Sequence, residues 1–372
     1  MGKYRFDEIA INSTQKKKPI EEDKSHYVGL EHIDPECFEI QQYGTEVAPV
    51  GEKLVMKKGD ILFGKRRAYQ RKVAIAPCDG IFSAHGMVLR PQTGVIDSSY
   101  FPFFISSDTF MDTAIRISVG GLSPTINWKD LAKQEFELPS LEEQKILADK
   151  LWAAYRLKEA YKKLLVATDE MVKSQFIEMY HKTHKEQILE SVCTIMGKGI
   201  TPKYVDSSSV VVINQACVHW DGQHLENVKY HNESIPVKKR TLETGDVLLN
   251  ATGNGTLGRC CVFNCPSDGN IYINDGHVIV LLTDRAVILP EVLNTYLSLN
   301  DTQAEIYRQY VTGSTNQVDI VFTDIKKMKV PVPNMGEQIL FVEILKQADK
   351  SKFDLKQCIE NIDKVIKSLI NG

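Results

Sequence analysis

A run of cations stands out among the residues whose chemistry suits a binding site. Residues 64–72 read Gly-Lys-Arg-Arg-Ala-Tyr-Gln-Arg-Lys, so that five cations surround one tyrosine and one glutamine. Lys and Arg bind phosphate groups, and Arg, Gln and Tyr also hydrogen-bond to base edges. The apolar runs 61–63 and 73–75 predict strands on both sides of this loop. The pattern indicates nucleic-acid binding; the alternative is a solvated charged turn.

The segment around this loop is basic as well. Between residues 49 and 91, nine Lys or Arg face three acidic residues. The whole chain carries a formal net charge of -3, which argues against a protein coated with cations but leaves room for one local patch. The residues of the first half that we expect to contact nucleic acid are Lys65, Arg66, Arg67, Tyr69, Gln70, Arg71, Lys72, Ser83 and His85.

A loop of different chemistry occupies the matching place in the second half. Residues 250–259 are rich in Gly, Asn and Thr, and the segment 195–260 has seven basic and six acidic residues, so no basic patch is present. Contacts here would come from amides, hydroxyls and backbone N–H groups, although a Gly/Asn run is often only a turn. The loops 120–125 and 312–317 are further candidates for backbone contacts. The candidate residues of the second half are Asn250, Thr252, Asn254, Thr256, Arg259, Asn274 and His277.

The two loops belong to an internal repeat. An ungapped shift of 194 residues aligns residues 130–174 with 324–368 at 12 of 45 positions, whereas chance gives about three at residue frequencies near 6%. Gly-Asp-Ile-Leu at 59–62 recurs as Gly-Asp-Val-Leu at 245–248, and the run 277–282 predicts a strand like those of the first half. We therefore expect two similar mixed α/β domains whose divergent loops read two different half-sites.

A long helix should follow each domain. In both halves a proline precedes an N-cap residue, Ser140 or Asn334, and a glutamate three residues later gives the spacing of a capping box. Heptad spacing follows in one shared frame. The seam positions are Leu147, Leu151, Ala154, Lys158, Tyr161, Leu165, Thr168, Val172 and Gln175 in the first helix, and Phe341, Leu345, Ala348, Lys352, Leu355, Ile359, Ile362, Ile366 and Leu369 in the second.

Connectivity predicts that these helices pair antiparallel and hold the two domains apart in pseudo-two-fold relation. Lys158 and Lys352 interrupt both seams at equivalent positions, and a polar residue there can set the register. A helix over residues 141–179 would extend about 58 Å, which suits a bipartite ligand such as duplex DNA, whose half-sites recur at about 34 Å. The alternative is that each helix packs only on its own domain.

Composition and missing motifs exclude several classes of protein. The 372 residues include 43% hydrophobic and 25% charged residues, which is typical of two or three globular domains. Neither an apolar stretch of membrane length nor a signal peptide is found, so we expect a cytoplasmic protein. The eight cysteines are scattered and should be reduced; Cys260, Cys261 and Cys265 with His277 lack the second cysteine pair of a zinc site.

Catalytic motifs are missing as well. The sequence has no phosphate-binding Gly-x-x-x-x-Gly-Lys-Ser/Thr loop, no Gly-x-Ser-x-Gly elbow and no His-Glu-x-x-His pair. It also lacks the Asn/Asp-Pro-Pro-aromatic segment of amino-methyltransferases. We therefore expect a protein that recognises its ligand without catalysing a reaction.

The duplicated plan resembles the specificity subunits of type I restriction-modification systems. The resemblance rests on Gly-Asp-Ile-Leu-Phe-Gly-Lys-Arg at 59–66 with Ser-Ala-His at 83–85, and on Phe-Glu-Leu-Pro-Ser-Leu-Glu-Glu-Gln at 136–144. The second half repeats these features as Gly-Asp-Val-Leu at 245–248 and Val-Pro-Val-Pro-Asn-Met-Gly-Glu-Gln at 330–338. It implies a non-catalytic subunit that reads a bipartite, asymmetric double-stranded DNA target. It also implies target-recognition domains at 1–140 and 181–334, and spacer helices at 141–180 and 335–372.

The resemblance further implies partners and cofactors. Two methyltransferase subunits and the restriction subunits would dock on the chain, and S-adenosylmethionine, ATP and Mg²⁺ would bind to those partners, leaving none on this chain. Two other hypotheses stay open: a coiled-coil scaffold whose two domains bind proteins, and an enzyme with an unrecognised site. DNA affinity that falls steeply with salt would separate the first hypothesis from the scaffold.

Overall fold

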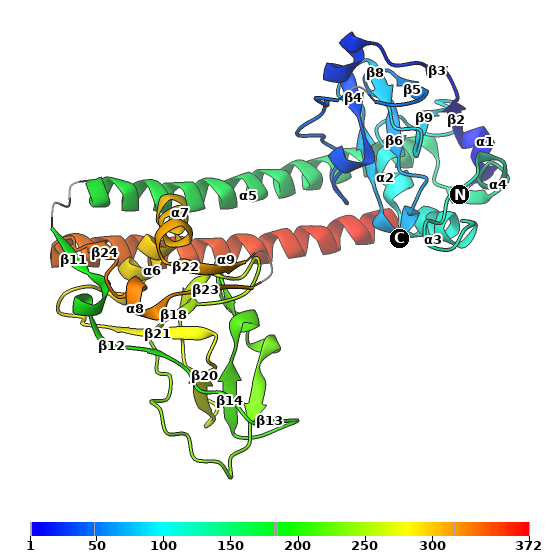
Figure 1. Cartoon of the computed structure of the whole chain (residues 1–372). Helices are drawn as coiled ribbons and strands as arrows, with labels where there is room; N and C mark the ends of the chain where they lie inside the picture. The colour runs from blue at the N-terminus through cyan, green and yellow to red at the C-terminus, as the bar shows by residue number, and fades with distance from the viewer. Residues whose placement is uncertain (1, 48, 182, 184, 315–316, 372) are drawn as a thin grey trace. The chain divides into compact units, whose positions relative to one another are not determined.

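Two compact units make up the chain. The computed structural model describes residues 2–47, 49–181, 183, 185–314 and 317–371. Unit 1 comprises Met1–Leu164 with Asp354–Gly372, and unit 2 comprises Leu165–Phe353. Two long helices, α5 (Leu141–His181) and α9 (Met335–Asn371), contribute residues to both units (Figure 1). Neither unit is therefore a continuous stretch of sequence.

Unit 1 contains two four-stranded sheets. The first is antiparallel throughout, in the order β2-β9-β6-β7; the second has the order β3-β5-β8-β4, in which β4 and β8 are parallel. Strands β1 and β10 form a separate pair. The strands are β1 (Gly2–Arg5), β2 (Ala10–Ser13), β3 (Lys16–Lys17), β4 (Tyr27–Val28), β5 (Lys53–Met56), β6 (Ile61–Phe63), β7 (Val73–Ile75), β8 (Gly80–Phe82), β9 (Met87–Pro91) and β10 (Glu135–Leu138). The short helices are α1 (Phe6–Ile9), α2 (Phe101–Ser106), α3 (Asp108–Arg116), α4 (Trp128–Leu131), η1 (Glu21–His26), η2 (Leu30–His32) and η3 (Ala68–Gln70).

Unit 2 repeats the antiparallel sheet of unit 1 in the order β12-β21-β18-β19. Its second sheet, β13-β17-β14-β20, also has one parallel pair, β14 with β20. The strands are β11 (Glu186–Ile188), β12 (Cys193–Lys198), β13 (Tyr204–Val205), β14 (Val210–Ile213), β15 (Val218–His219), β16 (Gly222–Gln223), β17 (Lys229–His231), β18 (Val247–Asn250), β19 (Cys260–Val262), β20 (Ile271–Asn274), β21 (Val278–Thr283), β22 (Val311–Ser314), β23 (Gln317–Ile320) and β24 (Lys329–Pro331). The helices are α6 (Pro290–Ser298), α7 (Asn300–Gln309), α8 (Phe322–Ile325), η4 (Leu189–Val192), η5 (Gln215–Cys217) and η6 (Leu225–Asn227).

The repeated Gly-Asp-apolar motif starts the central strand of each antiparallel sheet. Gly59 and Gly245 have φ of 89° and 98°, a region open to glycine but strained for other residues. Asp60 then accepts from the backbone N–H of Lys57 at 2.8 Å, and Asp246 accepts from that of Glu243 at 2.8 Å. Both carboxylates are buried and paired with an arginine, so the motif closes the turn that precedes β6 and β18.

Burial on both faces explains the unbroken apolar runs of β6 and β18. Ile61 and Phe63 lie in one hydrophobic core of unit 1 while Leu62 lies in the other. In unit 2, Leu248 is separated in the same way from its two neighbours in β18. Successive side chains of a strand point to opposite faces, so a sheet covered on both faces needs apolar residues at every position.

The long helices begin as the sequence predicts. Ser140 Oγ accepts from the N–H of Glu143 at 3.3 Å, and the Glu143 carboxylate accepts from the N–H of Ser140 at 2.9 Å, which completes a capping box. Asn334 Oδ1 caps α9 by accepting from the N–H of Glu337 at 3.0 Å. The residue that follows each glutamate is a fully buried glutamine, Gln144 or Gln338.

Helices α5 and α9 pack together and run antiparallel. Within unit 1, Lys158 pairs with Asp363 at 2.5 Å; within unit 2, Lys352 pairs with Asp169 at 3.0 Å. Both pairs join a lysine of one helix to an aspartate of the other, and the shift of 194 residues converts one pair into the other. The predicted antiparallel pairing is confirmed.

One predicted seam position is wrong. Gln175 is exposed, and the next residue, Phe176, is buried and packs edge-on against Phe341 with ring centroids 5.2 Å apart. The seam therefore takes two successive steps of four from Thr168 through Val172 to Phe176, because this end of α5 also packs into the core of unit 2. A strict heptad averages about 3.5 residues per turn, slightly below the 3.6 of an α-helix. A second step of four moves the buried positions around α5, so that they face the broad core of unit 2.

Candidate nucleic-acid interface

The basic loop of unit 1 connects β6 to β7, as predicted, and contains the short helix η3. Arg67 and Arg71, on either side of η3, have φ of 57° and 51°, a left-handed conformation that residues other than glycine seldom adopt. The Arg67 N–H donates to the carbonyl of Pro124 at 2.7 Å, and that of Arg71 donates to the carbonyl of Ala68 at 2.8 Å. Such backbone strain occurs mainly at binding and active sites.

Positive charge gathers at the start of this loop. The Arg66 N–H donates to the carbonyl of His85 at 3.2 Å, and its guanidinium lies 3.5 Å from the imidazole of the same residue. Burial, followed by Arg66, Lys65 and Lys53, lowers the pKa of His85. Burial and the charge of Lys16 lower the pKa of Lys65. We name these five residues the cation cluster. Its lysines and its arginine disfavour further positive charge at Lys65 and His85, and a bound anion would relieve that repulsion.

Two members of the cation cluster were not among the predicted contact residues: Lys16 was missed, and Lys53 was counted only as part of the basic segment 49–91. Lys16 lies in β3 and Lys53 in β5. These two strands pair with each other, so that Lys16 lies opposite Leu54 and Lys17 lies opposite Lys53. The run of three lysines at 16–18 was a usable signal. Its place beside the loop depends on sheet pairing between distant segments, which the sequence alone does not show.

The loop 119–125 lies against the basic loop. The Arg67 guanidinium donates two hydrogen bonds to Ser123 Oγ, at 3.1 and 3.3 Å, and Arg66 forms a backbone bridge with Thr125. The Tyr69 side chain is 53% exposed, and Gln70 is half-buried. The structure therefore brings the first part of the basic loop, the Ser83–His85 segment and the loop 119–125 together, with Ser83 itself buried.

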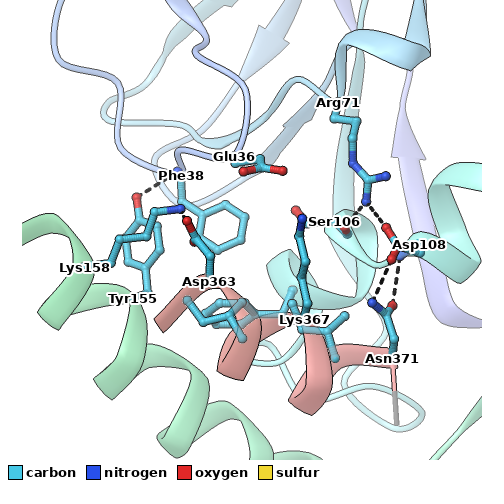
Figure 2. A pocket seen from close by; sticks show the side chains of 13 residues that line it. Glu36, Phe38, Arg71, Ser106, Asp108, Tyr155, Lys158, Asp363, Lys367 and Asn371 are labelled. Atoms are coloured by element: carbon cyan, nitrogen blue, oxygen red, sulfur yellow. Dashed lines mark hydrogen bonds and ion pairs between the residues drawn. The ribbon is translucent and has the colours of Figure 1, made fainter. Parts of the chain in front are cut away.

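The cations at the end of the basic loop are engaged within unit 1. The Arg71 guanidinium donates to the carbonyl of Ser106 at 3.0 Å and to the carboxylate of Asp108 at 2.6 Å. Figure 2 shows Asn371, at the end of α9, reaching the same carboxylate, which accepts from its amide at 2.9 Å. The Lys72 ammonium donates to the carbonyl of Leu30 at 2.6 Å. That either residue contacts DNA stays a prediction.

Two predicted residues of the second half, Asn250 in the loop and Asn274 at the end of β20, support the backbone. Asn250 is fully buried, and its amide donates to the carbonyls of Gln215 at 2.9 Å and Thr256 at 3.2 Å. Asn274 is also buried, and it donates to the carbonyl of Val278 at 2.7 Å. Their roles in the fold are visible, while a role in DNA contact stays a prediction.

Hydroxyl and imidazole groups of the second loop lie close together. Thr252 Oγ1 is 2.9 Å from His277 Nδ1, and His277 is exposed. The predicted strand 277–282 included His277, whereas β21 begins one residue later. The hydroxyls of Thr252 and Thr256 also donate to Gln215 Oε1, at 3.3 and 3.5 Å. Asn254 is exposed at the tip of the loop. Sequence reasoning missed Gln215, which lies 35 residues before Asn250.

Buried polar atoms remain unpaired beside this loop. Among the residues that the structure describes, Asn250 Oδ1 and Arg259 Nε are buried without a hydrogen-bond partner. Most buried polar groups in proteins are paired, so unpaired ones near a loop are compatible with a binding role.

Three cations of unit 2 have partners within the unit. Lys198 pairs with Asp319 at 2.9 Å, and Arg240 pairs with Asp246 at 2.6 Å. Lys229 lies over the ring of Tyr204, 4.9 Å from its centroid.

The two loops are held in equivalent ways despite their different chemistry. The carbonyl of Lys65 accepts from the N–H of Ile126 at 3.0 Å, and that of Ala251 accepts from the N–H of Ile320 at 2.7 Å. The loop at 312–317 is a hairpin of β22 and β23 in its described part; Thr315 and Asn316 lie outside the described residues.

The cysteines considered for a zinc site are not brought together. Cys260 and Cys261 follow each other in β19 and point into different cores, where burial raises the pKa of both thiols, that of Cys261 to about 12. Across the described residues, no helix has both the length and the apolar character needed to cross a bilayer.

Fold and loops together define a class: a duplicated α/β protein with two long paired helices, in which equivalent scaffolds carry one loop rich in cations and one loop rich in Gly, Asn and Thr. The chain belongs to the family of type I restriction modification DNA specificity domains, whose model matches residues 7–165 and again residues 189–364. Both halves are thus copies of this domain.

One curated relative and two solved structures are similar to the chain. The chain is 30% identical over 142 residues to the type I restriction enzyme EcoDI specificity subunit of Escherichia coli; the match covers 38% of this chain and about a third (31%) of that relative's length. A chain from a structure of type I R-M complex assembly and conformational transition has a TM-score of 0.61 at 17% identity, over 99% of this chain and 96% of that one. The S subunit from M. genitalium has a TM-score of 0.58 at 13% identity, over 99% and 95%. These two structures support the fold.

Proposed function

We propose that this chain is the DNA-recognition subunit of a type I restriction-modification complex and reads an asymmetric, bipartite target. Each copy of the specificity domain would read one half-site through the loop after its central strand. The observation that carries the proposal is the pair of loops held by equivalent backbone contacts but with different chemistry: one contributes to the cation cluster, and the other presents mainly hydroxyl, amide and imidazole groups.

The two half-sites should be bound by different interactions. In unit 1, Lys65, Arg66 and Arg67 would bind phosphates, and the exposed Tyr69 and the half-buried Gln70 would reach base edges. In unit 2, Thr252, Asn254 and His277 would act through hydrogen bonds with little net charge. The first half-site should therefore contribute most of the salt dependence of binding.

The chain would act within a larger assembly in the cytoplasm. We propose that two methyltransferase subunits and the restriction subunits dock on it, and that catalysis lies with them. S-adenosylmethionine, ATP and Mg²⁺ would bind to those partners and not to this chain, which would supply the position of the complex on DNA.

The test begins with the target. Mapping methylated adenines in the host genome gives both half-sites and the gap between them, and DNA with this sequence then serves as the probe for the reconstituted complex. An Arg66→Ala/Arg67→Ala variant should bind about tenfold to a hundredfold more weakly, and the slope of log affinity against log salt should fall by about 2, since each phosphate contact contributes about 0.9.

A matched control has the same loss of charge. Lys57→Ala/Lys58→Ala removes two exposed cations from the turn that precedes β6, whereas Arg66 and Arg67 follow its other end. Its affinity should stay within about twofold of the parent. Equal losses in both variants would contradict the assignment of the loop. A complex without salt-dependent affinity for this DNA would favour the protein scaffold instead.

A further inference from the structure

A cluster of metal-ligating groups lies in unit 2 on a hairpin without a role in the proposed function. Strands β15 and β16 pair His219 with Gly222, and Asp221 lies in the turn between them. His224 follows β16 directly. His219, Asp221 and His224 each offer one ligand atom, and these three atoms lie within 4.8 Å of one another. We name these three residues the His-Asp-His cluster.

Each imidazole of the cluster has an outer partner on one nitrogen. His224 Nδ1 lies 2.9 Å from Glu226 Oε1, and His219 Nε2 lies 3.1 Å from the carbonyl of Ala216. The other nitrogen of His224, Nε2, is 3.0 Å from Asp221 Oδ1. Metal-binding histidines nearly always carry such an outer carboxylate or carbonyl, which fixes the tautomer and leaves the second nitrogen for the ion.

The surrounding backbone holds the hairpin in place. The His224 N–H donates to the carbonyl of Cys217 at 2.8 Å. Gln223 exchanges two hydrogen bonds with the backbone of Asn264, at 2.8 and 2.7 Å. The imidazole rings of the cluster are stacked, with centroids 4.0 Å apart. The backbone of the hairpin is therefore ordered before an ion binds, while the stacked side chains must still turn towards the ion.

Two imidazoles and one carboxylate favour a particular class of ion. Imidazole suits Zn²⁺ and its neighbours in the first transition series, whereas Mg²⁺ and Ca²⁺ take oxygen ligands. Zinc bonds of about 2.0–2.1 Å place tetrahedral ligand atoms about 3.3 Å apart, so the cluster must contract. Asp221 is exposed in the turn, so its side chain can rotate inwards.

We propose that His219, Asp221 and His224 bind one Zn²⁺ ion, with Glu226 orienting His224 and water completing the coordination. The ion would connect His219 and Asp221, at the turn of the β15–β16 hairpin, to His224 directly after β16. This segment continues from η5, whose Gln215 supports the second loop through Asn250 and Thr252. The proposal concerns metal binding alone and does not rest on the proposed function.

The test uses the full chain, freed of metal by a chelator, in a Cys358→Ser background that removes its exposed thiol. Calorimetric titration with zinc chloride should give one ion per chain. His224→Ala and Asp221→Asn should each weaken this binding at least tenfold, and Glu226→Gln should weaken it about tenfold through the outer shell. His26→Ala, which removes an exposed histidine of unit 1, should leave it unchanged.

Cobalt(II) distinguishes this site from the cysteines. Absorption of the cobalt-loaded chain should show d–d bands without a sulfur-to-metal charge-transfer band, and these d–d bands should disappear in Asp221→Asn, which preserves the size of the side chain. Circular dichroism of each variant shows whether it is folded. Stoichiometric binding that survives in both His224→Ala and Asp221→Asn, a sulfur-to-metal band, or no zinc binding by the parent chain would overturn the proposal.

Discussion

Single residues of the cation cluster show how burial and charge act together. His85 combines partial burial with three neighbouring cations, and each of these effects disfavours the protonated imidazole. Arg67 holds a left-handed backbone conformation because Pro124 and Ser123 bind its backbone and side chain. In unit 2, the equivalent neighbourhood contains hydroxyls and an exposed histidine. Residue chemistry thus differs between two loops that are supported by the same backbone contacts.

The lowered pKa of His85 predicts a pH effect on DNA binding. Phosphate bound at the cation cluster would offset the charges of Lys53, Lys65 and Arg66 and raise this pKa again, so that binding takes up a proton. Affinity should therefore increase a few-fold as the pH falls below about 6.5. Fluorescence anisotropy with labelled target DNA at constant ionic strength measures this affinity at each pH. His85→Gln should lose most of this increase and His26→Gln should keep it; the same pH profile in all three proteins would refute the prediction.

Lower pH should have the opposite effect on the stability of the fold. The folded-state pKa of His85 lies below the ordinary value near 6.5, so the unfolded chain binds the proton more readily. The contribution of neutral His85 to the free energy of unfolding is therefore fully present above about pH 6.5, and it is lost as the pH falls through the lowered pKa of the folded state. Acid should therefore lower the free energy of unfolding of the free protein while it raises the affinity for DNA.

Among the elements, α5 and α9 are anchored by repeated polar contacts. Gln144 Oε1 accepts from the N–H of Asp97 at 2.8 Å, and Gln338 Oε1 accepts from that of Leu289 at 2.8 Å. Each glutamine amide also donates to the proline carbonyl that precedes the helix, at 2.9 Å in both cases. Further along, Lys158 and Lys352 each pair with an aspartate of the opposite helix. The burial of these two lysines differs, and this difference provides a test.

The two ion pairs between the helices should differ in strength. The Lys158 side chain is 7% exposed, while that of Lys352 is 25% exposed and also pairs with Asp349. Asp363→Ala leaves a buried ammonium without its partner and should lower the free energy of unfolding by about 2–3 kcal/mol, less than for a fully buried pair because Asp363 is partly exposed. Asp169→Ala, its equivalent in the repeat, should lower it by at most about 1 kcal/mol. Urea unfolding compares them, and equal losses would show that burial does not govern these pairs.

At the scale of the whole molecule, the compact units do not follow the halves of the chain. Ile366, Leu369 and Ile370 of α9 pack against the core of unit 1, which is otherwise built from the first half. Val172 and Phe176 of α5 lie in the core of unit 2. The hypothesis that each helix packs only on its own domain is therefore wrong, because each core takes residues from both helices.

If the helices set the distance between the half-sites, shortening both should change the DNA target. Removing residues 161–167 and 354–360 deletes one heptad from each helix and keeps both lysine–aspartate pairs. Seven residues correspond to about 10 Å of helix, or about three base pairs at 3.4 Å each. Methylation mapping of cells that carry the shortened chain should give the same half-sites with a shorter gap. An unchanged gap would contradict a role of the helices as a spacer.

Much of the plan was readable from local patterns. The capping box at Ser140, the strands on both sides of the basic loop and the internal repeat depend on residues close in sequence or on direct comparison of the two halves. The antiparallel pairing of the helices followed from connectivity. Short-range preferences and simple periodicities survive folding when the tertiary environment agrees with them.

Other features were decided only by tertiary structure. Sheet pairing places Lys16 and Lys53 in the cation cluster. Arg71 pairs with Asp108, and Phe176 takes the seam position that was predicted for Gln175. Each outcome depends on which distant segment lies opposite a side chain, and a linear pattern carries no such information. The sequence by itself determined the repeated elements and the types of chemistry on each loop; only packing decided which charges remain free, because desolvation and pairing depend on neighbours in space.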